Sequence, residues 1–140
     1  MKYTTKKIEL TNDHFLAVTD LAEYTHEIFS DFKNSHFSKK YKNQPFPGQY
    51  LLFIAGGLAE SYDKLFKDIY ALIEIKNVKF LKPAFINDKV YLDAELLKTT
   101  EKFYYFDWKV LNQNKELLLF CKVKFLRCLL YTSPSPRDRI

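Results

Sequence analysis

The chain has 140 residues, of which 47% are hydrophobic and 17% aromatic, a composition that suits one globular domain with a real core. Its formal net charge is +5, and its two cysteines make neither a disulfide framework nor a zinc-binding pattern. No run approaches the roughly 18 apolar residues of a membrane span, and the first residues lack the apolar core of a signal peptide. We therefore expect a cytoplasmic protein with no metal site and no membrane contact.

The last residues, 127–140, differ in composition from the chain before them. All three arginines lie there, whereas every basic residue before them is a lysine. The segment also resembles translated adaptor or vector sequence, and Pro134 and Pro136 disfavour a place inside a sheet. We expect a folded domain over residues 1–126 and a non-native tail over 127–140. Without the tail the basic balance is mild, which removes the main support for nucleic-acid binding.

Near the start of the chain, residues 6–10 favour a short strand, and Thr11 then offers a capping oxygen for a helix. Apolar residues from Phe15 to Phe29 fit one broad helical face. Residues 25–44 are mostly polar, with isolated aromatics and two of the three histidines. We expect this stretch to be a loop that precedes the central helix.

Residues 50–59 contain no charged residue, which predicts a helix that is apolar all round and wrapped by other elements. Two prolines and a glycine upstream place its start near Gly48 or Gln49. Its first amides would be free to bind a ligand. Gly56 and Gly57 each cost roughly 1 kcal/mol relative to alanine in a helix, which indicates that another backbone packs closely there.

After this helix the apolar period changes from helical to two. We expect four long antiparallel strands, near residues 69–80, 90–96, 103–110 and 117–125. Asparagines mark turns at 86–88 and 112–114, because asparagine tolerates positive φ. The economical packing is an α+β fold in which a curved antiparallel sheet wraps around one long buried helix. Its open edge strand predicts a homodimer, because pairing across a two-fold axis covers that edge.

Residues 80–88, Phe-Leu-Lys-Pro-Ala-Phe-Ile-Asn-Asp, resemble the strand-and-turn signature of MaoC-like hot-dog proteins, the family of (R)-specific enoyl-CoA hydratases and dehydratases. Asn87 stands where a glycine is usual in that family. The order of opening helix, polar loop, proline-rich entry and buried helix is also similar, over residues 8–126. The resemblance implies a hot-dog fold, a homodimer with sites at the subunit interface, and an acyl thioester of coenzyme A or acyl carrier protein as ligand.

The family's catalytic loop has an Asp, an Asn and a His, with the His five positions after the Asp. Asp31 and His36 keep that spacing, whereas Asn34 lies one position later than usual and the family proline is missing. Hydration of a 2-enoyl thioester needs a group that takes a proton from water at C3 and a route that delivers one to C2. The resemblance implies that Asp31 and His36 hold that water. From the residues alone, Asp31 caps a turn and His36 is a solvated loop residue.

A second departure from the family concerns the start of the central helix. The family commonly opens this helix with His-Gly, and the glycine amide donates to the thioester carbonyl, whereas this chain has Gly48-Gln49. A free amide at the helix start can still polarise a carbonyl, although the Gln49 side chain hinders approach. We therefore expect Asn34, Gly48 and Gln49 to bind substrate. His26 and Glu27 form a competing acid/base pair if the loop is aligned in another register.

Two classes of function follow. The first is a hydratase or dehydratase that interconverts 2-enoyl and 3-hydroxyacyl thioesters without a metal or redox cofactor. The alternative is a hot-dog protein that binds acyl thioesters without catalysis, or a thioesterase of the same fold. A basic nucleic-acid binder ranks third, because Lys39, Lys40 and Lys42 are more often a solvated face or a contact for CoA phosphates.

Overall fold

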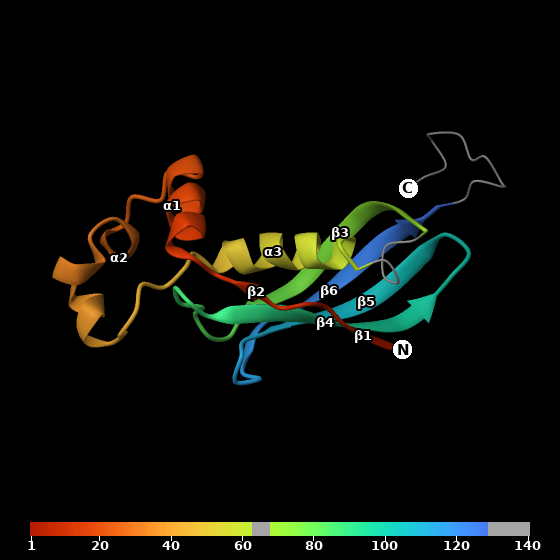
Figure 1. Ribbon diagram of the computed structural model, residues 1–140. Coiled ribbons are helices and arrows are strands. Elements are labelled where there is room, and N and C mark those ends of the chain that lie inside the picture. Colours follow the sequence, from red (N-terminus) through yellow and green to blue (C-terminus); the bar gives the residue numbers. More distant parts are fainter. Residues whose placement is uncertain (63–67, 129–140) are drawn as a thin grey trace.

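An antiparallel sheet curves around one helix in the computed structural model, which describes residues 1–62 and 68–128 (Figure 1). The helices are α1 (Asn12–Leu21), α2 (Glu27–Ser30) and α3 (Gly48–Glu60), with 3₁₀ turns η1 (Phe32–Asn34) and η2 (His36–Lys39). The strands are β1 (Lys2–Thr4), β2 (Ile8–Glu9), β3 (Ile69–Phe80), β4 (Lys89–Thr99), β5 (Phe103–Leu111) and β6 (Leu117–Arg127). Neighbouring strands follow the order β1-β4-β5-β6-β3, and β2 also pairs with β4. The expected α+β arrangement is confirmed.

The four long strands lie where the period-two pattern predicts them. Val90 and Leu92 on β4 and Leu119 and Cys121 on β6 are fully buried, whereas their neighbours Asp93 and Lys122 are partly exposed. Successive side chains of a strand point to opposite faces, so this alternation gives the sheet one apolar face. That face packs against α3 and forms the core.

The two turns predicted from asparagine differ in outcome. Asn87 has a φ of 76°, as expected for the turn between β3 and β4. In the turn between β5 and β6 the positive φ of 60° falls on Lys115, so the assignment to asparagine is wrong there. Asn112 instead holds this turn with its side chain, because its Oδ1 accepts hydrogen bonds from the backbone N–H groups of Asn114 and Glu116, both at 3.0 Å.

The first helix begins at the predicted cap and ends earlier than its apolar pattern suggests. Thr11 Oγ1 accepts from the backbone N–H of His14, and His14 Nδ1 accepts from the backbone N–H of Thr11, both at 3.2 Å. Glu23 has a φ of 55°, and this left-handed residue follows the end of α1. Phe29 therefore lies in the separate helix α2, and the prediction of one helical face extending to Phe29 is wrong.

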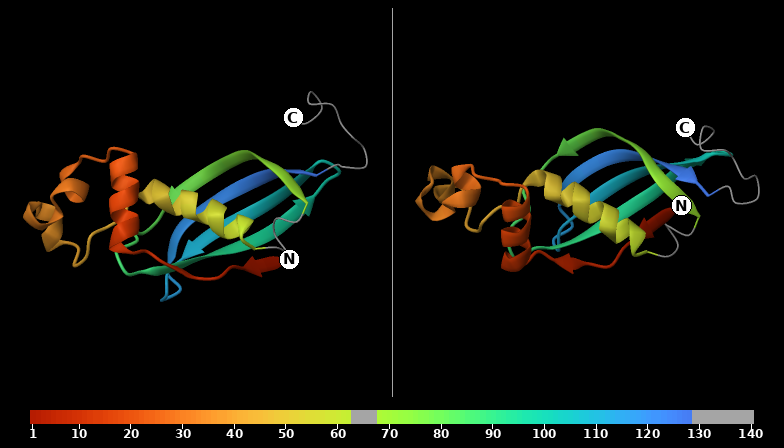
Figure 2. Two further views of the ribbon diagram at one scale, coloured as in Figure 1. Left: turned by 45° about the horizontal axis from the view of Figure 1, so that its top comes forward. Right: turned by 90° about the horizontal axis from the view of Figure 1, so that it is seen from above.

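Residues 25–44 form a compact projection beyond α1, away from the sheet (Figure 2). Its internal hydrogen bonds are mostly local, such as the one from Ser35 Oγ to Phe32 O at 2.7 Å. Gln44 Nε2 donates to Ile28 O at 2.7 Å and so joins the two ends of the projection. The expected loop is therefore an ordered segment of short helical turns.

The segment with the family-like signature holds the start of α3. Phe46 N donates to Ala84 O at 2.8 Å, and Ile86 N donates to Gln44 O at 3.1 Å. Phe46 and Ala84 are both buried. The chain just before α3 is therefore hydrogen-bonded to the connection between β3 and β4, which fixes where the helix begins.

Helix α3 begins at Gly48 as predicted, but the chain covers only one of its sides. Leu51 and Ala55 are buried, whereas Phe53 is 78% exposed. A Cβ placed on Gly56 or Gly57 would meet no atom of the described residues within 4 Å apart from its own helix and chain neighbours. The predictions that this helix is wrapped all round, and that a second backbone approaches its glycines, are wrong for the single chain.

The last strand continues past the expected domain boundary at Leu126. Arg127 Nη1 donates to Thr100 O at 2.7 Å, and the backbone N–H of Cys128 donates to Asp68 O at 2.6 Å. Arg127, which we assigned to the tail, is thus the last residue of β6, and Cys128 is hydrogen-bonded to the residue just before β3. The remainder of the predicted tail, 129–140, lies outside the described residues.

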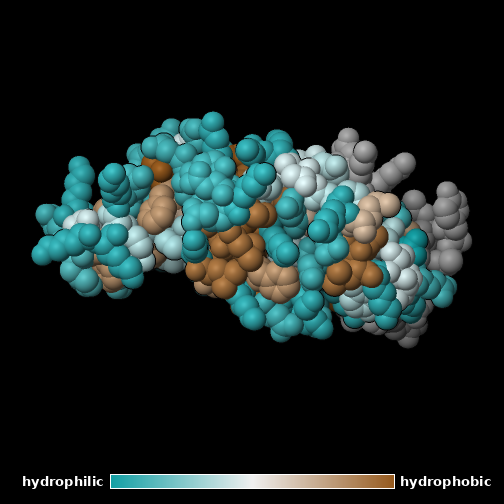
Figure 3. Space-filling view, turned by 90° about the horizontal axis from the view of Figure 1, so that it is seen from below, coloured by the Kyte–Doolittle hydropathy of each residue, from teal (hydrophilic) through white to brown (hydrophobic). Residues whose placement is uncertain are grey.

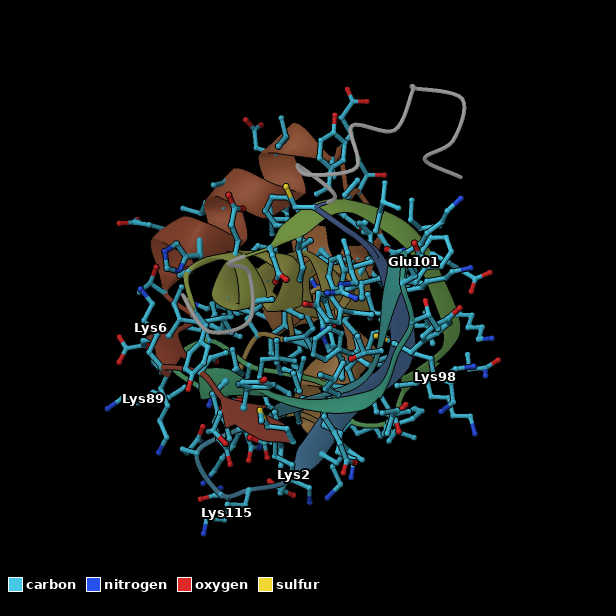
Figure 4. The ribbon with its side chains drawn as sticks, turned by 90° about the vertical axis from the view of Figure 1, so that its right-hand side faces the viewer. Lys2, Lys6, Lys89, Lys98, Glu101 and Lys115 are labelled. Carbon is cyan, nitrogen blue, oxygen red and sulfur yellow. The ribbon has the colours of Figure 1, made fainter. Side chains whose placement is uncertain are left out.

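The surface carries its charge on several sides. Figure 4 shows Lys2, Lys6, Lys89, Lys98 and Lys115 pointing outward around the molecule. The face seen from below is mostly hydrophilic with separate hydrophobic patches (Figure 3). No helix within residues 1–62 and 68–128 has the length and hydrophobicity to cross a bilayer.

Two truncations test the boundary of the domain. Ending the chain after Cys128 should leave the melting temperature nearly unchanged, because the segment removed carries prolines that a sheet interior excludes. Ending it after Leu126 should lower Tm by about 5–10 °C, because hydrogen bonds worth about 1 kcal/mol each are lost with Arg127 and Cys128. Thermal unfolding followed by circular dichroism measures both. A large drop in Tm for the chain that ends after Cys128 would show that residues 129–140 are a native part of the fold.

The buried thiol of Cys121 should be inert in the native protein. Burial, with a smaller contribution from Asp107, raises its pKa to about 11, so little reactive thiolate forms at about pH 8. An alkylating reagent should modify the partly exposed Cys128 and leave Cys121 intact until the protein is unfolded, as mass spectrometry of digested protein would show. Rapid native labelling of Cys121 in a Cys128→Ser variant would contradict the described core.

Candidate functional site

An apolar pocket of about 560 Å³ lies between α3 and the sheet. Leu52, Phe53 and Gly56 line it from the helix, and Leu72, Trp108 and Phe125 line it from the strands. Concave, mostly apolar cavities of this size are typical of small-molecule sites. The pocket therefore suits an acyl chain better than a polar ligand.

Within residues 1–62 and 68–128, the pocket is lined by one amide and one carboxylate side chain, which lie near opposite ends of α3. Gln49 lies at the start of α3 and Glu60 at its last residue, and both line the pocket. At 1.5 Å per residue they are separated by about 16 Å along the helix axis. A ligand with one polar head and an apolar chain fits this distribution.

The first turn of α3 has no side-chain cap, since its N-cap residue is Pro47. Gly48 lies close to a neighbouring ring, because a Cβ at this position would lie 3.1 Å from Cδ1 of Phe80 and the half-exposed ring would have to shift slightly. Gly48 and Gln49 are both exposed. The two predicted binding residues at the helix start are thus open to a ligand.

The Gln49 side chain is held by a residue that the sequence did not single out. Tyr24 lies beyond the end of α1, and its hydroxyl donates to Gln49 Oε1 at 2.5 Å. The Tyr24 ring packs edge-on against Phe29, with the ring centroids 5.3 Å apart. No spacing rule links Tyr24 to Gln49, so only the folded chain reveals this contact.

The predicted acid/base residues on the projection have different partners from those expected. Asp31 Oδ1 accepts from Asn34 Nδ2 at 3.0 Å. His36 Nδ1 lies 3.3 Å from Glu27 Oε1, and both side chains are more than half exposed. Within residues 1–62 and 68–128, no hydrogen bond or ion pair joins Asp31 to His36. The structure pairs His36 with Glu27 and Asp31 with Asn34.

Among the described residues, the alternative acid/base candidates, His26 and Glu27, each contact other residues and do not pair with each other. His26 Nδ1 accepts from Ile28 N at 3.1 Å, so this histidine caps the short helix α2. Its ring centroid lies 5.8 Å from that of Phe37, and the His36 ring lies 4.0 Å from Phe37. Glu27 therefore has a histidine partner, but the partner is His36 and not its neighbour in sequence.

The acid/base candidates and the pocket are separate within one chain. Every residue that lines the pocket belongs to α3 or to the sheet, and none comes from residues 25–44. The views in Figures 1 and 2 agree that the projection with α2 extends away from α3, beyond α1. In the described part of the chain, no three His, Cys, Asp or Glu side chains gather closely enough to hold a metal ion.

Comparison with solved structures shows the fold. The chain is 24% identical to the monoamine oxidase regulatory protein of Archaeoglobus, with a TM-score of 0.76 over 91% of this chain and 88% of that one. An (R)-hydratase of A. caviae involved in PHA biosynthesis is 16% identical, with a TM-score of 0.71 over 89% of this chain and 92% of the other. The C-terminally truncated HadBC (3R-hydroxyacyl-ACP dehydratase) complex of Mycobacterium tuberculosis is 11% identical, with a TM-score of 0.71 over 89% and 94%.

No protein-family model and no curated sequence matches the chain. The similar structures confirm the predicted hot-dog fold. They also confirm the resemblance to MaoC-like proteins and (R)-hydratases inferred from residues 80–88. At these identities the likeness is one of fold, and the chemistry has to be argued from this chain's own residues.

Proposed function

We propose that this protein is a hydratase or dehydratase that interconverts 2-enoyl and 3-hydroxyacyl thioesters of coenzyme A or an acyl carrier protein. The observation that carries the proposal is the apolar pocket along α3, which begins at Gln49 beside an uncapped helix start. An acyl chain would lie in this pocket with its thioester at the Gln49 end. The names of two similar structures, an (R)-hydratase and a 3R-hydroxyacyl-ACP dehydratase, support the same general reaction.

His36 would act as the general base. A proton on His36 Nδ1 that is shared with Glu27 leaves the lone pair on Nε2 free to accept a proton from water. The oxygen of that water forms a bond to C3 of the enoyl group, and the proton taken up by His36 is passed to C2, so that H and OH of one water add across the double bond. Asp31, which the family resemblance assigns to the same water, would be held in place by Asn34.

A homodimer would bring the two halves of this site together. One chain keeps the projection away from its own pocket, and it leaves Phe53 beside that pocket 78% exposed. Strand β3 is the last strand in the order of the described sheet, and an edge strand can pair with the edge of a second copy. In a two-fold assembly the projection of one chain would reach the pocket of its partner, and each dimer would contain two equal sites.

A binding protein without catalysis, or a thioesterase, is the second candidate. Two observations favour this candidate: the helix starts with Gly48-Gln49 and not with His-Gly, and His36 is exposed. A protein that only binds an acyl chain needs neither a His-Gly start nor a sheltered histidine. Nucleic-acid binding has less support. The lysines labelled in Figure 4 point outward on several sides of the molecule.

Kinetics of loop variants test the proposed chemistry. Asp31→Asn and His36→Ala should each lower the hydration rate of a short 2-enoyl-CoA by about 10²–10⁴-fold, the range expected for loss of a general acid or base. Binding of a saturated acyl-CoA should persist, because the apolar pocket remains intact. Loss of the enoyl absorbance measures the rate, and calorimetry measures binding. Asp20→Asn, which removes an exposed carboxylate on α1, is the matched control.

The outcomes separate the alternatives. A wild-type protein that binds acyl-CoA but never hydrates it would support the binding protein. A full loss in Glu27→Gln with no change in Asp31→Asn would show that Glu27 is the catalytic carboxylate.

The proposed dimer predicts a specific sensitivity at Phe53. Wild-type protein should sediment as a dimer at micromolar concentration, and Phe53→Asp should sediment as a monomer, because it places a charge in the proposed apolar interface. Leu21→Asp is the control, since Leu21 is 86% exposed at the end of α1 and away from that interface. A monomeric wild-type mass would contradict the assembly.

A further inference from the structure

Besides the free backbone amides at the start of α3, the proposed site contains a second group that can polarise the thioester carbonyl, the side chain of Gln49. Among the described residues that line the pocket, Gln49 and Glu60 are the only ones with an amide or carboxylate side chain. Glu60 would repel the negative charge that develops on a carbonyl oxygen, and it lies at the far end of α3. A carboxamide carries two N–H donors, which suit an oxygen that gains charge.

The hydrogen bond from Tyr24 limits how this carboxamide can turn. Because Gln49 Oε1 accepts from the Tyr24 hydroxyl at 2.5 Å, the carboxamide is held by its oxygen, and the NH₂ group on the other arm of the planar amide is left as the donor. Tyr24 itself is fixed at its backbone, where its N–H donates to Thr19 O at 3.0 Å. The left-handed Glu23 immediately before it turns the chain at the end of α1. The end of α1 thus carries a fixed hydroxyl that orients the amide of α3.

We propose that the NH₂ group of Gln49 donates a hydrogen bond to the thioester carbonyl oxygen, and that Tyr24 is the positioning residue that orients it. The inference rests on the proposed function and adds a named group to it. When water adds at C3, electron density from the C2–C3 double bond moves toward the thioester oxygen until C2 takes a proton. Gln49 stabilises that oxygen and exchanges no proton itself. The side chain at this position thus supplies the donor and does not merely hinder approach.

Four variants distinguish hydrogen-bond donation by the Gln49 NH₂ group from an effect of the size of that side chain. Gln49→Ala removes the donor, and Gln49→Glu keeps an acceptor for Tyr24 but replaces the NH₂ group by a carboxylate oxygen. Each should lower kcat by about 10²–10³-fold with little change in KM, the range for losing one such donor. Tyr24→Phe keeps the ring against Phe29 and should lower kcat by roughly tenfold or less. Tyr105→Phe, on the opposite side of the sheet, is the control and should change nothing.

A double variant tests whether Tyr24 acts through Gln49. Adding Tyr24→Phe to Gln49→Ala should cause no further loss, because the group that Tyr24 orients is already absent. A full additional loss would show that Tyr24 has a separate role and would overturn its assignment as a positioning residue.

Infrared difference spectroscopy with carbonyl-labelled butyryl-CoA gives a readout that does not depend on hydration, since this saturated thioester cannot be hydrated. The bound carbonyl stretch should lie at lower frequency than that of the free thioester, and it should return toward the free value in Gln49→Ala. A shift that depends on Gln49 in a protein without hydratase activity would refute the proposed function and support this inference. An unshifted carbonyl, a shift that persists in Gln49→Ala, or no binding of butyryl-CoA would overturn it.

Discussion

Two backbone hydrogen bonds fix the position of the start of the central helix relative to the sheet, and the candidate site depends on them. Pro45 and Pro47 have no N–H group, so Phe46 provides the only backbone donor in this short stretch, and it donates to Ala84 O. Ile86 N returns a bond to Gln44 O, so the entry to α3 pairs with the connection between β3 and β4. The sheet therefore fixes the start of α3, which would otherwise be free to shift along its own axis.

The fixed start explains the form of the pocket. With its first turn anchored, α3 turns Leu51 and Ala55 into the core and leaves Phe53 and Gly56 on the open side. The open side faces strands whose own apolar residues, such as the half-exposed Leu72, remain uncovered. Burial of apolar surface is worth about 25 cal/mol per Å², so a chain that leaves this surface open gains free energy when an acyl chain or a second copy covers it.

The projection formed by residues 25–44 is held together by short-range hydrogen bonds, unlike the sheet. Most of its hydrogen bonds join residues three to five positions apart, such as those from Ser30 to Thr25 and from Ser38 to Ser35. These short-range contacts give Glu27 and His36 a defined relation to each other. They do not set the distance to the pocket, which depends on how the whole segment is placed beyond α1 (Figure 2). The internal geometry of a loop and its position relative to a site are therefore separate problems.

The sequence by itself determined the features that depend on local chemistry. Period-two alternation predicts the four long strands, a threonine predicts the cap of α1, and two prolines before Gly48 predict the start of α3. Residues 80–88, together with the order of opening helix, polar loop, proline-rich entry and central helix, indicated the hot-dog fold. Each of these signals lies within a few neighbouring residues, so it can be recognised from the sequence without the tertiary structure.

Only the tertiary structure decided which residues meet. It pairs His36 with Glu27, joins Tyr24 to Gln49, and extends the last strand to Arg127. It also leaves one side of α3 uncovered, although the sequence of that helix is apolar all round. Spacing along the chain did not identify these contacts, because each joins residues that come together only when the chain folds. Hydrophobicity predicts that a surface will be covered, but the fold decides whether this chain or another molecule covers it.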